Sequence, residues 1–126
     1  MPQDRLSRWY QDVERRTDAD LASAARTTTA TGTAFNCDSA FAVLASLNIT
    51  AASGTTPTLD LRLETTADGG TTWYTVAAFP QQTTTTGTPV ARVFAPLGSQ
   101  ARFAWTVAGT TPSFTFGVTV SADRDD

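Results

Sequence analysis

The stretch Ser53-Gly54-Thr55-Thr56-Pro57-Thr58-Leu59-Asp60-Leu61 recurs, lightly changed, as Ala108-Gly109-Thr110-Thr111-Pro112-Ser113-Phe114-Thr115-Phe116. Each copy stands between two runs in which every second residue is apolar, the period of β-strands with one buried face. Gly accepts positive φ, and Pro presets φ while ending a hydrogen-bonded ladder. Each Gly-Thr-Thr-Pro segment therefore predicts a short hairpin connection. We expect two related hairpins stacked into an antiparallel β-sandwich.

The predicted fold class is all-β, a jelly-roll-like or Ig-like antiparallel β-sandwich of about seven strands. Strands are expected at about residues 27–36, 40–51, 58–66, 71–79, 88–95, 101–108 and 113–122. The segment Ala67-Asp68-Gly69-Gly70 adds a hairpin signal, because Asp-Gly and Gly-Gly pairs accept the positive φ of primed turns. Greek-key and meander connections share these signals, so the strand order stays open.

Charge is distributed unevenly along the chain. Residues 1–26 contain five arginines and five acidic residues, whereas residues 27–122 contain only seven charged residues. Such a shift in composition marks a boundary. We expect a helical N-terminal arm over 1–26, a β-sandwich domain over 27–122 and an acidic tail over 123–126.

The spacing of apolar residues in the arm is that of one helical face, i, i+3, i+4, i+7. Thr17 followed by Asp20 resembles a capping box and predicts a second short helix from Asp18 to Ala25. A helix of about 14 residues is marginal alone in water, so its apolar stripe has to be buried. It packs either on its own domain or on a neighbouring subunit. In the second case, the predicted partner-binding residues are Leu6, Trp9, Tyr10 and Val13.

The composition argues against catalysis. The chain has no His and no Lys, so its nine basic residues are all arginines. The usual general base, the commonest metal ligand and the Schiff-base amine are therefore missing. Cys37, with no imidazole to ionise it, is expected to be a small buried hydrophobe, and one cysteine excludes an internal disulfide framework. We expect no enzymatic activity, no cofactor and no metal.

The same composition argues against two classes of binding partner, nucleic acids and membranes. A net charge of −3 without a basic cluster on the β portion argues against nucleic-acid binding. No stretch approaches the roughly 20 apolar residues that span a bilayer, and arginines interrupt any apolar run at the start of the chain. We expect synthesis in a cytoplasm without membrane insertion.

Two acidic constellations are conceivable as sites. Asp60 and Glu64 on one strand would stand roughly 13 Å apart, beyond the distance that glycosidase carboxylate pairs use. A solvated strand face with local pairing to Arg62 explains them better. Asp38, Asp60 and Asp68 have none of the spacing of a calcium-binding loop.

The aromatic residues offer one alternative. Asp68-Gly69-Gly70-Thr71-Thr72-Trp73 resembles a sialidase Asp-box, yet a single copy indicates a common turn on which Trp73 folds back. Trp105 alternates with Phe103 and Val107, which predicts a core position. Of Trp73 and Tyr74, one must face outward on a regular strand and could stack on a sugar.

Several runs of the second half resemble a known group of proteins. They are Leu59-Asp60-Leu61-Arg62-Leu63-Glu64, Asp68-Gly69-Gly70-Thr71-Thr72-Trp73, Arg102-Phe103-Ala104-Trp105-Thr106-Val107 and Thr111-Pro112-Ser113-Phe114-Thr115-Phe116. Similar runs occur in small β-sandwich proteins encoded among the structural genes of tailed bacteriophages and phage-like particles. The resemblance covers about residues 58–120.

The resemblance implies a virion component, such as a capsid decoration, minor head or tail-associated protein. Such a protein is made in the host cytoplasm, binds the major capsid protein or neighbouring subunits, and has no catalytic residue to transfer. A polar face of threonine suits this role, because covering it desolvates few charges. We expect a non-enzymatic homo-oligomer or lattice-bound subunit anchored through its arm. The alternative is a tail-associated carbohydrate- or host-surface-binding module.

Overall fold

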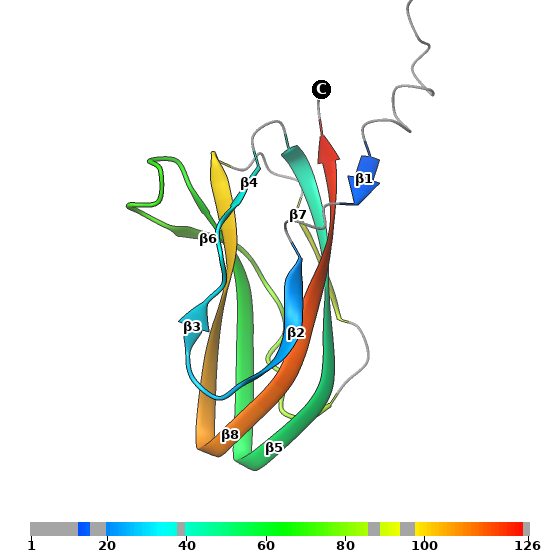
Figure 1. The fold of residues 1–126 in the computed structure, drawn as a ribbon, viewed down its shortest axis with the longest axis vertical. Coiled ribbons are helices and arrows are strands. Elements are labelled where there is room, and N and C mark those ends of the chain that lie inside the picture. Colours follow the sequence, from blue (N-terminus) through cyan, green and yellow to red (C-terminus); the bar gives the residue numbers. More distant parts are fainter. Residues whose placement is uncertain (1–12, 16–19, 38–39, 86–88, 94–97, 125–126) are drawn as a thin grey trace, which may run out of the picture.

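Two long strands, β5 (Ala40–Thr66) and β8 (Gln100–Arg124), carry the fold. The computed structural model describes residues 13–15, 20–37, 40–85, 89–93 and 98–124. In these residues eight strands form a single sheet, and every pairing in it is antiparallel (Figure 1). The shorter strands are β1 (Val13–Arg15), β2 (Leu21–Arg26), β3 (Ala30–Thr31), β4 (Phe35–Asn36), β6 (Tyr74–Ala78) and β7 (Val90–Val93). The all-β antiparallel class predicted from the sequence is confirmed.

β5 and β8 pair along nearly their whole length, from Ala40 opposite Arg124 to Thr66 opposite Gln100. Both strands bend back sharply at their Gly-Thr-Thr-Pro segments, which lie together at the lower end of Figure 1. The bend divides the sheet into two layers. Layer 1 contains 40–53 of β5 and 113–124 of β8, and layer 2 contains 58–66 of β5 and 100–108 of β8.

The predicted hairpins at these two segments are therefore wrong. In a hairpin, 40–53 would bond to 58–66, whereas here each half bonds to β8 and the two halves stand in different layers. The local signal is the same in both cases, because a glycine with positive φ serves a bend as well as a turn. The strand pairings form one sheet that folds over on itself. The predicted jelly-roll-like or Ig-like strand arrangement is not established by these pairings.

The short strands extend the two layers. β7 pairs with β5 in layer 1 and β6 pairs with β5 in layer 2. On the other side β1 and β2 pair with the layer 1 half of β8, and β3 and β4 with its layer 2 half. The predicted strands at 71–79 and 88–95 match β6 and β7, and the strand predicted at 27–36 is split into β3 and β4.

The apolar core lies between the layers. Every second residue points into it over 43–49 and 59–63 of β5 and over 101–105 and 114–120 of β8, as the sequence periodicity predicts. Trp105 of layer 2 meets Phe116 of layer 1 edge to face, with ring centroids 5.7 Å apart, a geometry that aromatic pairs favour. The fully buried large side chains include Leu47, Ile49, Leu59, Leu61, Leu63, Phe103, Phe114, Phe116, Val118 and Val120.

The start of the chain departs from prediction where it is described. The second helix expected from Asp18 to Ala25 is wrong for its main part, because Leu21–Arg26 form β2. β2 pairs with β8, from Leu21 opposite Val118 to Arg26 opposite Phe114. Val13, assigned to the first helix, begins β1 and pairs with Asp123. An open edge of β8 offers backbone partners that weak local helix signals cannot match.

In the described residues no helix is long and apolar enough to cross a membrane.

Candidate interaction surfaces

The predicted partner-binding stripe falls mainly outside the described part of the chain. Leu6, Trp9 and Tyr10 lie outside the described residues, and Val13 is described as the first residue of β1. The helix predicted for residues 1–12 and the partner-binding role of the arm therefore stay predictions, whereas residues 13–15 and 21–26 of the predicted arm are strands. Its last predicted member, Val13, is placed at the end of layer 1 where β8 finishes.

The turn between β5 and β6 is built around Asp68. Its Oδ1 accepts hydrogen bonds from the Thr66 hydroxyl at 2.8 Å and from the backbone N–H of Thr71 at 3.2 Å and Thr72 at 2.9 Å. Gly69 and Gly70 adopt positive φ, as the sequence predicts. These donors, the Thr72 N–H first, lower the pKa of Asp68 to about 2. The carboxylate organises the turn through its Oδ1 atom.

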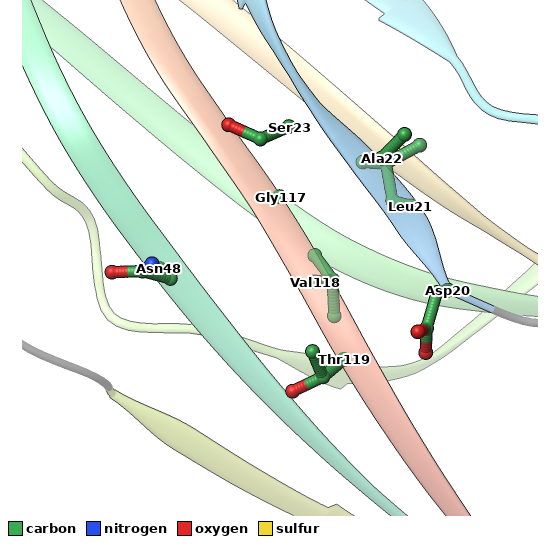
Figure 2. A pocket seen from close by; sticks show the side chains of 8 residues that line it. All are labelled: Asp20, Leu21, Ala22, Ser23, Asn48, Gly117, Val118 and Thr119. Atoms are coloured by element: carbon green, nitrogen blue, oxygen red, sulfur yellow. The ribbon is translucent and has the colours of Figure 1, made fainter. Parts of the chain in front are cut away.

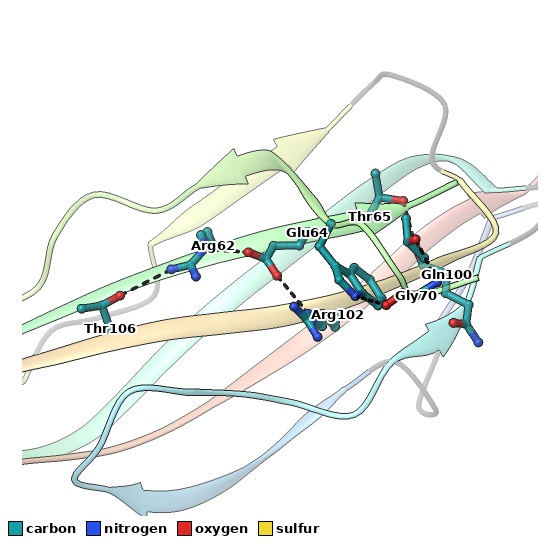
Figure 3. A network of polar contacts seen from close by, with 9 residues as sticks. Arg62, Glu64, Thr65, Gly70, Gln100, Arg102 and Thr106 are labelled. Atoms are coloured by element: carbon teal, nitrogen blue, oxygen red, sulfur yellow. Dashed lines mark hydrogen bonds and ion pairs between the residues drawn. The ribbon is translucent and has the colours of Figure 1, made fainter. Parts of the chain in front are cut away.

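A buried carboxylate joins the two long strands on the outer face of layer 2. Glu64 of β5 accepts from Arg62 Nε and from Arg102 Nε of β8, each at 2.9 Å (Figure 3). Burial alone would raise the pKa of Glu64, but the hydrogen bonds and charges of the two arginines outweigh it, and the pKa is lowered. The predicted pairing with Arg62 is confirmed. The predicted solvent exposure is wrong for Glu64, because Arg102 reaches it from the neighbouring strand.

Aromatic residues beside this cluster are the basis for the sugar-stacking alternative. Trp73 folds back as predicted: its indole N–H donates to the Gly70 carbonyl oxygen, and the Arg102 guanidinium lies 4.1 Å from its ring centroid. Trp105 is buried in the core, also as predicted. Tyr74 is 60% exposed and is the outward member of the adjacent pair.

The remaining candidates for chemistry are accounted for by local contacts. The Asp60 carboxylate accepts from the Gln81 side-chain amide at 3.0 and 3.2 Å. Cys37 is buried as predicted, with its thiol directed to the Gly98 carbonyl oxygen. Asp38 lies outside the described residues. Among the residues that the structure does describe, no three His, Cys, Asp or Glu side chains gather as a metal site.

The outer face of layer 1 has a different chemistry. Between residues 44 and 50 of β5 and between 115 and 121 of β8, its outward positions contain no charged residue. Three register pairs run across it, Leu44–Ser121, Ser46–Thr119 and Asn48–Gly117. We call this surface the neutral face. It consists of Leu44, Ser46, Asn48, Thr50, Thr115, Gly117, Thr119 and Ser121.

Two large apolar side chains stand out at one side of the neutral face. Leu44 is 42% exposed, and Val90 of β7, opposite Ser46 in the register, is 55% exposed. Together with Tyr74 they are the large hydrophobic residues that are exposed in the described part of the chain. Charged residues enter the register only at the borders of this face, with Arg92 opposite Leu44 and Arg15 opposite Ser121.

A hollow of about 400 Å³ lies at the other side of the neutral face, where β2 begins (Figure 2). Asn48, Gly117 and Thr119 line it from the long strands, and Asp20, Leu21 and Ser23 line it from the β2 side. The backbone of β2 bulges between Leu21 and Ala24 and passes close over Gly117. A Cβ atom at Gly117 would lie 2.9 Å from the Leu21 carbonyl oxygen, so a glycine is needed there.

Sequence reasoning missed both the apolar pair and the hollow. One signal was available: Val43 and Leu44 are adjacent apolar residues in an alternating run, so one of them has to face outward. The sequence held no comparable signal for the hollow, because the hollow depends on where the bulged backbone of β2 lies against β8.

These observations define an all-β antiparallel protein with an uncharged outer face on layer 1 and a buried carboxylate–arginine cluster on layer 2. No protein-family model and no curated protein sequence matches the chain. Among solved structures, the fold is similar to that of the SPBc2 prophage-derived protein YomS. The TM-score is 0.50 at 13% sequence identity, and the match covers 86% of this chain and 94% of YomS. At this identity the likeness shows a shared fold.

Proposed function

We propose that the chain is a non-enzymatic structural subunit of a phage or phage-like particle, a capsid decoration or minor head protein anchored through its N-terminal segment. The observation that carries the proposal is the fold likeness to a prophage-derived protein across nearly all of that protein's length. It agrees with the resemblance of the 58–120 sequence runs to virion β-proteins.

The surface chemistry supports the same role. An uncharged face of serine, threonine and asparagine can be covered by another protein at little desolvation cost. The described carboxylates Asp60, Glu64 and Asp68 each have hydrogen-bond partners within the chain. These carboxylates stabilise the fold, and the uncharged face remains exposed for contact with another protein.

The structure shows which residues can be deleted to test anchoring without removing a described strand. Removing residues 1–26 would remove β2, whose strand pairs with β8, and would confound loss of anchoring with loss of fold. Removing residues 2–12 keeps every described strand. We expect this shorter chain to retain the β-sheet signal of the full chain in circular dichroism and to stop co-sedimenting with particles.

The experiment uses particles produced by the phage or prophage that encodes the chain, banded in a density gradient. Full-length chain is expected in the particle band at a fixed ratio to the major capsid protein. The double variant Trp9→Ala/Tyr10→Ala is expected to behave like the deletion, with Tyr74→Ala as the matched aromatic control that still incorporates. Absence of the full-length chain from the band would refute the proposal, and normal incorporation of the deleted chain would refute the anchor.

One observation favours a second candidate, a tail-associated carbohydrate- or host-surface-binding module. Tyr74 is 60% exposed and follows the Asp68 turn, as a stacking residue would. Trp73 is less suited, because its ring faces Arg102. A glycan array with the parent and with Tyr74→Ala tests this candidate. Specific binding that is lost in the variant supports it, and no specific binding by the parent excludes it.

A further inference from the structure

We propose that two copies of this chain associate through the neutral face, with Leu44 and Val90 of each copy filling the hollow of the other. The inference concerns self-association in solution and does not depend on the proposed virion role. It starts from the placement of an apolar projection and a hollow on one sheet face.

The projection and the hollow lie on opposite sides of the same face. Leu44 and Val90 are on the β7 side, whereas the hollow is lined from the β2 side and by Asn48 and Thr119. A two-fold axis that lies in the plane of contact and runs along the strands sets each side of one copy against the opposite side of the other. That axis places the projection of each copy at the hollow of its partner, as a closed dimer requires.

The distribution of charged residues favours a second copy of the chain as the partner that covers the neutral face. In a two-fold contact every residue near the axis meets a copy of itself or of its neighbour, so charged residues there would oppose like charges. The positions of the neutral face are uncharged, and charged residues enter the register only at its borders. Depletion of charged residues at the centre of a contact is typical of protein interfaces. The outer face of layer 2, with Arg62, Glu64 and Arg102, lacks this property.

The chemistry of the hollow fits an aliphatic side chain. Ala22 contributes an exposed apolar side chain and Leu21 a partly buried one, whereas Val118 is 1% exposed and adds almost no surface. Asn48 and Thr119 are neutral polar groups at its edge. The Asp20 carboxylate also lines it, and its Oδ1 accepts the backbone N–H of Val120 at 2.8 Å. Burying Leu44 and Val90 there removes from water two of the large apolar side chains that the described surface exposes.

The first test is the molar mass of the full chain by size-exclusion chromatography with light scattering, at about 100 μM, where a micromolar Kd gives mainly dimer. We expect a dimer. Leu44→Glu and Val90→Glu place carboxylates in the contact and should each raise the dimer Kd at least tenfold. Tyr74→Glu is the matched control, since Tyr74 is as exposed but lies on β6 in layer 2, and it should remain dimeric.

A second test addresses the geometry. Leu44→Cys and Thr119→Cys chains are mixed and oxidised, and a disulfide between the two different chains is expected. Neither variant alone should cross-link efficiently, because each residue faces the other's position across the axis. The native Cys37 is 2% exposed and gives little background. Tyr74→Cys mixed with Thr119→Cys is the negative control.

A monomeric parent overturns the proposal, as does a dimer that Leu44→Glu and Val90→Glu leave intact. A dimer that cross-links only as Leu44→Cys with Leu44→Cys would also overturn it, because the projection would then meet itself. Circular dichroism of each variant confirms that the fold persists, so that loss of dimer is read from folded chains.

Discussion

Gly54 and Gly109 each face the backbone of the other's bend. A Cβ atom at Gly54 would lie 2.8 Å from the carbonyl oxygen of Thr111, and one at Gly109 would lie 2.8 Å from that of Thr56. Both glycines adopt positive φ, as do both of these threonines, at 46° and 47°. The two sequence repeats thus form one paired bend in which each strand holds the other in place.

Replacing either glycine should weaken the bend strongly. Gly54→Ala and Gly109→Ala each combine positive φ, which costs a residue with a Cβ about 1–2 kcal/mol, with a displacement of the opposing backbone. We expect each to lower the free energy of unfolding by about 2–4 kcal/mol in urea titrations. Gly69→Ala is the control, because Gly69 has φ +76° but nothing within 4 Å of a Cβ. Equal losses at Gly54 and Gly69 would show that the close approach is unimportant.

Removing the buried carboxylate should weaken the pairing of the long strands in layer 2. Glu64→Ala leaves the Nε atoms of Arg62 and Arg102 without their shared acceptor, and we expect a loss of about 2 kcal/mol in unfolding free energy. Asp60→Ala, on the same strand face, removes only contacts with the exposed Gln81 and should cost about 0.5 kcal/mol. Similar costs for the two variants would contradict a special role for Glu64.

Asp68 should contribute to acid sensitivity. Its folded pKa of about 2 lies below the ordinary value of 3.8. The unfolded state therefore binds its proton first as pH falls. The resulting stability is present above pH 3.8 and is lost as pH falls toward 2. Asp68→Asn keeps an acceptor oxygen but cannot titrate, so its midpoint in urea should fall less steeply between about pH 4 and pH 2 than that of the parent. Parallel pH profiles would show that the turn is insensitive to this proton.

Arg26 should hold β2 against the edge of the core. Its guanidinium lies 4.9 Å from the Trp105 ring centroid and 4.5 Å from that of Phe116, and it donates to the carbonyl oxygens of Ala22, Ala24 and Phe116. A lysine ammonium cannot make this set of contacts.

We therefore expect Arg26→Lys to cost about 1–2 kcal/mol and to speed amide hydrogen exchange in β2 more than in the β5–β8 pairing. Exchange that rises evenly across the sheet would mean that Arg26 acts on global stability alone.

Periodicity and turn chemistry predicted much of the described fold. The apolar alternation around Leu47, Leu61 and Phe116 located the halves of the two long strands as separate strands, and the same alternation assigned Trp105 to the core. The Asp68 turn with its folded-back Trp73 was likewise predictable. These features depend on residues that are neighbours in sequence, so local rules suffice for them.

Other features were beyond local rules. Leu21–Arg26 carry a helix-compatible pattern, yet β8 supplies backbone partners for a strand. Glu64 was expected to be solvated because nothing in its own strand reveals that Arg102 stands opposite it. The hollow exists only because β2 passes over Gly117.

The amino-acid order alone determined that this chain forms antiparallel strands with one buried face, because side-chain alternation is a property of each strand taken separately. Tertiary structure decided what the two repeats do. A glycine followed by Thr-Thr-Pro permits either a tight reversal or a bend, and pairing across β5 and β8 selects the bend, since it satisfies the backbone of both halves at once. That choice creates the two layers, and with them the neutral outer face.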